Sequence, residues 1–334
     1  MEIKQYAPVL IPTLNRYEHF KRCLESLERC TGADKTDVYI GLDFPPSDKY
    51  RKGWEKIDLY LKEKEKTHSF KNLYVRRRDH NCGVGKDGSN ASLLRKEIEE
   101  KYEYYISTED DNEFSPCFLE YMNKCLVRFK DDIRINLVCG YNYVMDFPES
   151  YKNNFYITKW GCPWGTGQWI SKLKLLRQYY SLEKIAEIIK TDETYYLLKR
   201  RYPQYLVSAI NMLKDGELHG DAIKGIYATI NDTYCVLPRE SMVRNHGNDG
   251  TGEHSKKMND SQNVFYAYQP ISQESSFEFT DDIFTYEPVY LVRRHYVQKM
   301  NLFRLLHKMH SNMCFKIDIF LFRKFNYLPK SRWI

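Results

Sequence analysis

YYISTEDD (Tyr104–Asp111) is an apolar run that ends in three adjacent carboxylates. Its aromatic and β-branched residues are typical of a buried strand, which has no structural reason to end this way. Three neighbouring anions repel one another unless a cation lies between them, and Mg²⁺ or Mn²⁺ suits carboxylate and phosphate oxygens. Ligands of open α/β sheets also bind at the carboxyl ends of the strands. The stretch therefore predicts a metal-dependent ligand site; the alternative is a solvated acidic turn that caps the next helix.

The first 145 residues alternate strand and helix patterns. Apolar runs that predict strands lie at residues 8–13, 38–42, 73–75, 104–108 and 135–139. Amphipathic stretches between these runs predict helices, so the fold class is α/β with a mostly parallel sheet flanked by helices. Residues 176–214 are expected to form a helical insert, and the chain beyond Pro288 a basic, amphipathic helical tail.

The composition is that of a globular protein. The chain has 334 residues, 42% of them hydrophobic and 29% charged, which is enough for one large domain or two modest ones. No run of apolar residues is long enough to span a membrane. The N-terminus has no signal pattern, and nine cysteines without CxxC pairs are typical of reduced thiols. A cytoplasmic location is expected.

The net charge of +6 is concentrated at the C-terminal end. Residues 289–334 contain ten Lys and Arg but a single acidic residue, Asp318, so this segment carries +9 and the rest of the chain −3. Cations alternate with apolar residues at helical spacing over residues 290–325, which fits a helix on an anionic membrane, at the inner face of the cell membrane. The alternative is a helix packed on the catalytic domain with a solvated basic face.

Three polar features follow expected strands: the Asn15–Arg16 loop, Asp43 and the acidic triplet. The carboxyl ends of parallel strands share one edge of a sheet, so these side chains should converge.

An Arg can hold a diphosphate, and an Asp at a strand end can accept a hydrogen bond from a base or ribose. Arg16 as a solvated helix residue and Asp43 as a turn residue are the alternatives. The Gly-rich loop at 81–88 matches neither nucleotide-binding Gly motif and has a plain flexible loop as its alternative.

The chain resembles a GT-A glycosyltransferase of the bacterial family-2 type, and it is also similar to the N-acetylglucosaminyltransferase I group. PVLIPTLNR (8–16), RCLESL (22–27) and EDDNEFSPCFLEY (109–121) carry the resemblance, which extends over residues 7–255. It implies a Rossmann-like GT-A sheet, a nucleotide-sugar donor and a Mn²⁺ or Mg²⁺ ion. The implied divisions are a nucleotide-sugar-binding half at 1–145, an acceptor-binding half with the helical insert at 146–285 and the basic tail at 286–334.

The same resemblance implies roles for individual residues. Asp111 would contact the metal, with His254 as a further ligand, and Asp221 would be the catalytic base of an inverting transfer. The residues implied to bind the donor are Thr13, Asn15, Arg16, Asp43, Asn81, Lys86, Asn90, Glu109, Asp110 and Thr251. Those implied to bind the acceptor are Trp160, Trp164 and Gly165.

Alternatives remain open for several of these roles. The tryptophans could belong to the core, and His254 could be an exposed loop residue. The rival candidates for the base are Asp215, Glu217 and Asp232.

The expected function is transfer of a sugar from a nucleotide-diphosphate sugar, with a UDP-sugar favoured, to a hydroxyl of a glycan or lipid-linked acceptor in bacterial surface-polysaccharide synthesis. A nucleotidyltransferase would place a Gly-rich basic loop after the first strand, where residues 13–16 have none. A non-catalytic sugar-binding relative would lack the acidic residues. A nucleic-acid-binding protein would use the basic tail but leave the acidic triplet without a purpose, so no nucleic-acid partner is expected.

Overall fold

The computed structural model describes residues 3–83, 88–142, 145–147, 149–159, 161–252, 270–280, 292–293 and 302–329. The chain forms two units. One comprises residues 1–171 with 235–293, and the other comprises residues 172–234 with 294–334. All nine cysteines of the sequence are free thiols, most of them buried.

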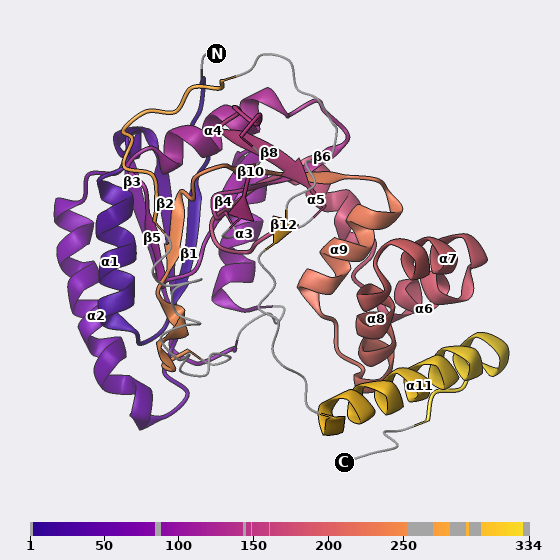
Figure 1. Ribbon diagram of the computed structural model, residues 1–334. Helices are drawn as coiled ribbons and strands as arrows, with labels where there is room; N and C mark the ends of the chain where they lie inside the picture. The colour runs from indigo at the N-terminus through magenta and orange to yellow at the C-terminus, as the bar shows by residue number, and fades with distance from the viewer. Residues whose placement is uncertain are drawn as a thin grey trace. The chain divides into compact units, whose positions relative to one another are not determined.

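The described part of the first unit is built on an eight-stranded sheet with the order β3-β2-β1-β4-β9-β6-β10-β8 (Figure 1). The strands are β1 (Val9–Thr13), β2 (Asp37–Leu42), β3 (Asn72–Arg77), β4 (Tyr104–Ser107), β6 (Ile135–Cys139), β8 (Phe155–Thr158), β9 (Thr166–Trp169) and β10 (Tyr234–Pro238). β1 pairs in parallel with β2 and β4, and β2 with β3. β9 is antiparallel to both β4 and β6, so β6 runs in the same direction as β4. The predicted α/β class with a mostly parallel sheet is confirmed.

Helices cover the strands of this sheet. They are α1 (Tyr17–Glu28), α2 (Asp48–Thr67), α3 (Asn90–Lys101) and α4 (Phe118–Arg128). α3 packs on β1 and β2, and α4 on β6 and β9. α1 buries a stripe formed by Phe20, Cys23, Leu24 and Leu27. Strands covered in this way are buried along nearly their whole length, as β1 and β2 are.

Short elements complete the first unit. β5 (Asn112–Phe114) pairs with β11 (Val243–Asn245), and β7 (Met145–Asp146) pairs with β12 (Val292–Arg293), both antiparallel. Two 3₁₀ turns, η1 (Ala33–Lys35) and η2 (Gly247–Asp249), lie in the connections. The β5–β11 ribbon matters most for the site because it brings the chain around residue 245 beside the end of β4.

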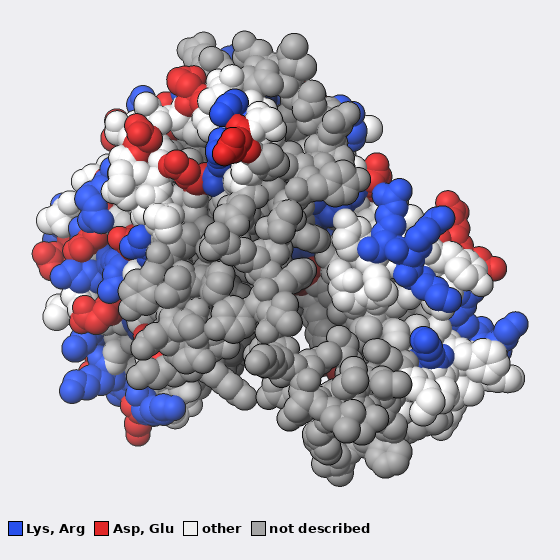
Figure 2. All heavy atoms as spheres, viewed as in Figure 1, with Lys and Arg blue, Asp and Glu red and all other residues white. Residues whose placement is uncertain are grey.

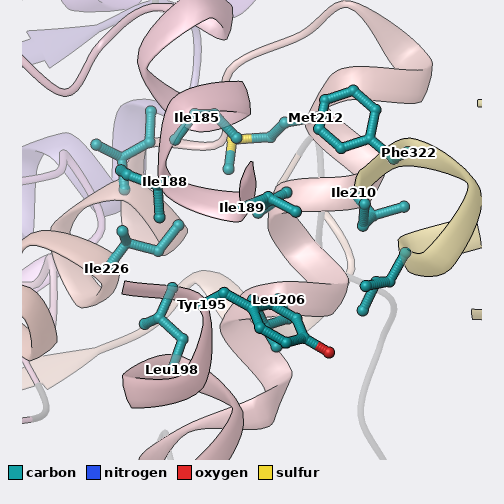
Figure 3. Close-up of a cluster of buried hydrophobic side chains, with 13 residues drawn as sticks. Ile185, Ile188, Ile189, Tyr195, Leu198, Leu206, Ile210, Met212, Ile226 and Phe322 are labelled. Atoms are coloured by element: carbon teal, nitrogen blue, oxygen red, sulfur yellow. The ribbon is translucent and has the colours of Figure 1, made fainter. Parts of the chain in front are cut away.

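The second unit is helical in its described part. Its helices are α5 (Ile170–Arg177), which begins in the first unit, α6 (Leu182–Lys190), α7 (Asp192–Arg201), α8 (Pro203–Asp215), α9 (Gly220–Ile230) and α11 (Leu302–Phe325). Apolar side chains from α6, α7, α8, α9 and α11 form one core, in which Ile189, Ile210 and Phe322 are buried (Figure 3). The predicted helical insert and helical tail are confirmed. None of the helices in the described part of the chain is long and apolar enough to cross a bilayer.

Gly53 fixes the distance between α2 and the Asn15–Arg16 loop. A Cβ at this position would lie 2.0 Å from the backbone oxygen of Asn15. Only a glycine therefore allows the helix to pass directly behind the loop that carries Arg16.

We expect Gly53→Ala to lower the free energy of unfolding by about 1–3 kcal/mol because the added methyl group overpacks a backbone contact. Urea denaturation would measure the change. The matched control is Gly220→Ala, where the nearest atom to the new Cβ is the Tyr180 hydroxyl at 3.5 Å. A Gly53→Ala protein that is as stable as the wild type would contradict this account of the loop.

Candidate functional site

Arg16 lies between two buried carboxylates at the carboxyl edge of the sheet. One guanidinium nitrogen contacts Asp110 Oδ1, and the other lies 2.9 Å from Asp111 Oδ2. The Thr13 hydroxyl donates a hydrogen bond of 2.8 Å to Asp110 Oδ2. β1 and β4 are parallel neighbours, so the loops that follow them meet here. The acidic triplet predicts a nearby cation, and the Arg16 guanidinium is one such cation.

The two aspartates differ from Glu109 in their surroundings. Asp110 and Asp111 are only 7% and 6% exposed, whereas Glu109 is exposed. Burial raises the pKa of Asp110, and the nearby Asp111 adds to this, although Arg16 and Thr13 oppose it. Burial disfavours the charged form of Arg16, but the two carboxylates outweigh it and raise the pKa of Arg16. Arg16 therefore stays charged between the two carboxylates.

The segment after β11 closes around Asp111. Asn245 Nδ2 donates to Asp111 Oδ1 at 2.7 Å, and the backbone N–H of His246 donates to the Asp111 carbonyl at 2.8 Å. A Cβ on Gly247 would lie 2.2 Å from Asp111 Oδ2, so a larger residue would push the carboxylate away. Asn245 thus orients Asp111 Oδ1, while Arg16 contacts Asp111 Oδ2. These two residues are far apart in the sequence.

Two histidine–carboxylate pairs lie beside Asp111. His246 Nε2 is 2.8 Å from Glu113 Oε2, and this hydrogen bond lowers the pKa of Glu113. His19 Nε2 is 3.1 Å from Asp249 Oδ2 and 3.2 Å from the His246 carbonyl. Sequence reasoning missed both pairs. The dense polar run at residues 245–249, directly after a strand, was the available signal.

Thr251 holds the Asp249 carboxylate in place through two hydrogen bonds. Its backbone N–H and its hydroxyl both donate to Asp249 Oδ1, at 2.9 and 2.7 Å. Burial works against ionisation, yet these hydrogen bonds lower the pKa of Asp249. Thr251 is itself exposed.

Asp43 and Asn81 come together at the same edge. The backbone N–H of Asp43 donates to the Thr13 carbonyl at 3.1 Å, which places Asp43 beside the end of β1. Asn81 Nδ2 contacts Asp43 Oδ2 at 3.3 Å and the Phe44 carbonyl at 2.7 Å. The structure therefore brings Thr13, Arg16, Asp43 and Asn81 to one edge with the two aspartates.

Other residues singled out in the sequence have packing contacts. Asn90 is buried at the start of α3 and donates to the Arg76 carbonyl at 3.1 Å. The Trp164 ring meets the edge of Tyr141, with centroids 4.7 Å apart. Gly165 has φ +67°, and its carbonyl accepts a 2.7 Å hydrogen bond from Gly140.

Asp221 belongs to the second unit. It lies in the first turn of α9, is exposed, and its carboxylate is 3.7 Å from Lys224 Nζ. A carboxylate in a first turn is favoured by the helix dipole. Lys86, Trp160 and His254 lie outside the described residues.

The acidic pair has the chemistry for a divalent ion. In the described part of the chain no group of three or more His, Cys, Asp or Glu side chains is placed to hold a metal. Asp111 nevertheless offers carboxylate oxygens, which Mg²⁺ and Mn²⁺ prefer. An ion at Asp111 would need further oxygen ligands, such as those of a diphosphate.

No family model and no curated protein matches the chain. Among solved structures, it is similar to S. aureus TarS 1–349 in complex with UDP, with 13% identity, a TM-score of 0.39 and coverage of 72% of this chain and 60% of that one. It is also similar to the mannosyltransferase PcManGT from Pyrobaculum calidifontis in complex with GDP-Man and Mn²⁺, with 14% identity, a TM-score of 0.37 and coverage of 68% and 69%. The chain spans 32% of a longer TarS structure. A mannosyltransferase is a glycosyltransferase, the class that the sequence resembles.

We expect Arg16→Met to lower the free energy of unfolding by roughly 2–4 kcal/mol, because it leaves two buried carboxylates uncompensated. The value lies below the full cost of a broken buried pair because the Arg16 side chain is 20% exposed. Lys62→Met is the control, since Lys62 is 61% exposed and its partner Asp58 keeps a second cation, Arg77, at 2.6 Å. Chemical denaturation at pH 7 measures both, and equal losses would contradict the role given to Arg16.

Proposed function

We propose that the chain transfers a sugar from a nucleotide-diphosphate sugar, with a UDP-sugar as the favoured donor, to a hydroxyl of a glycan or lipid-linked acceptor. The observation that carries this proposal is the cluster of Arg16, Asp110 and Asp111 at the carboxyl edge of a mostly parallel sheet. Ligands of such sheets bind at that edge. Surface-polysaccharide synthesis in a bacterium is the setting that the sequence resemblance suggests.

The donor would lie along the edge from Asp43 to Asp111. Asp43 and Asn81 offer an acceptor and an amide for the base or ribose, and Arg16 offers a guanidinium for the diphosphate. Asp110 is held by Thr13 and Arg16. Its proposed part in donor binding is therefore to keep the Asn15–Arg16 loop in position. Glu109, Asn15, Asn90, Lys86 and Thr251 complete the proposed donor set.

Asp111 would hold a Mn²⁺ or Mg²⁺ ion, with His254 as a further proposed ligand. When bound, such an ion neutralises the charge on the leaving diphosphate. Arg16 lies beside the same Asp111 carboxylate. Its guanidinium would therefore be close enough to the ion to stabilise the diphosphate as well.

The acceptor side is proposed from residues further along the chain. Asp221 would remove the proton from the acceptor hydroxyl as it attacks the anomeric carbon, which gives inversion. Trp160, Trp164 and Gly165 would bind the acceptor sugar. In this division, residues 1–145 bind the donor, residues 146–285 bind the acceptor, and residues 286–334 form the basic tail.

A donor that binds the folded chain should raise its melting temperature. At a concentration 100 times Kd the stabilisation is about 2.7 kcal/mol. We expect one class among UDP-, GDP-, CMP- and dTDP-sugars to give this shift in a fluorimetric screen, and Mn²⁺ to enlarge it. Asp111→Asn should abolish the shift, whereas the exposed control Asp34→Asn should retain it. No shift with any donor, or an undiminished shift in Asp111→Asn, would refute the donor site.

Asp221→Asn should slow hydrolysis of the stabilising donor by about 10²–10⁴-fold, because water then loses its general base. Release of the nucleoside diphosphate measures the rate, and the donor-induced melting shift should be unchanged. The variants Asp215→Asn, Glu217→Gln and Asp232→Asn test the rival bases in parallel. Full activity in Asp221→Asn, with loss in one of these three, would reassign the base.

A further inference from the structure

α11 presents two different faces in its described part. Phe315, Ile319 and Phe322 pack into the core of the second unit, as Figure 3 shows for Phe322. Asp318 on the same side is buried and forms an ion pair with Lys214 of α8. This face anchors the helix to α6 and α8.

The opposite face is apolar but exposed. Met313, Ile317 and Phe320 are 56%, 37% and 55% exposed. They follow one another at i, i+4 and i+7, so they form a stripe along one side of the helix. The residues packed in the core lie about half a turn away from this stripe. A helix on the surface of a globular protein normally shows polar residues there, and a contiguous exposed apolar stripe marks an interaction site.

Cations flank the stripe. Lys316 and Lys324 are exposed and fall on the same side of α11, whereas Arg323 is turned to Asp192 and the Tyr195 ring. The whole second unit contains 19 Lys and Arg against 9 Asp and Glu, a formal charge of +10. The first unit contains 32 against 36, a charge of −4. In Figure 2, Lys and Arg lie over the described helices of the second unit and also over α1 and α2 of the first.

We propose that the outer face of α11, formed by Met313, Lys316, Ile317, Phe320 and Lys324, docks on an anionic lipid bilayer. The apolar stripe would enter the boundary between headgroups and acyl chains while the lysines meet anionic headgroups. α11 contains 24 residues and is about 36 Å long. One of its faces packs against the core of the second unit. It therefore lies along the membrane surface, which agrees with the absence of a membrane-spanning helix among the described residues.

Vesicle sedimentation tests this proposal directly and needs no sugar donor. The full chain should sediment with vesicles of phosphatidylcholine containing about 30% phosphatidylglycerol, and not with phosphatidylcholine alone. Ile317→Ser with Phe320→Ser should reduce the partition coefficient at least about tenfold. Lys316→Gln with Lys324→Gln should reduce it about tenfold and weaken its dependence on salt.

Matched controls keep this test specific. Leu59→Ser removes a side chain of the first unit that is 71% exposed, and Lys52→Gln with Lys66→Gln removes two exposed charges from α2. Both controls should bind vesicles like the wild type, and all variants should melt normally because the changed side chains are exposed. Absence of binding to anionic vesicles would overturn the proposal. Concentration-dependent dimerisation that the Ile317→Ser/Phe320→Ser variant abolishes, without vesicle binding, would overturn it in favour of a contact between two copies.

Discussion

The contact of Arg16 with Asp110 and Asp111 is the interaction on which the site depends. Two buried carboxylates can stay ionised only beside a compensating charge, and the chain brings that charge from the loop after β1. The contact joins the ends of two parallel strands. Asn245 and Gly247 complete the enclosure from a segment more than 130 residues away. Carboxylate oxygens suit a divalent cation, and the Arg16 guanidinium suits a diphosphate, so this edge carries groups for both.

Much of this fold could be predicted because its strands and helices have clear local patterns. The run at residues 8–13 is observed as β1, and the helix expected between the runs at 73–75 and 104–108 is observed as α3. The antiparallel insertion of β9 between β4 and β6 was not predicted, because residues 166–169 (TGQW) show no apolar run and their pairing is long-range.

The convergence of Arg16, Asp43 and the acidic triplet at one edge of the sheet was predicted, but the contacts among these side chains were not. The acidic triplet by itself indicated that a cation must lie between the carboxylates, and a metal ion was the natural interpretation. Arg16 is more than 90 residues away in sequence, so no local pattern shows that its charge meets Asp110 and Asp111. The pairs of His19 with Asp249 and of His246 with Glu113 were missed for the same reason. The predicted roles in donor, acceptor and metal binding stay predictions.

The structure of the chain with Mn²⁺ and the nucleotide that stabilises it, determined with anomalous scattering, tests the central claim most directly. The account predicts a manganese peak at the Asp111 carboxylate and a diphosphate in contact with both the ion and Arg16. A nucleotide bound away from the carboxyl edge of the sheet, or a manganese ion that does not touch Asp111, would contradict it.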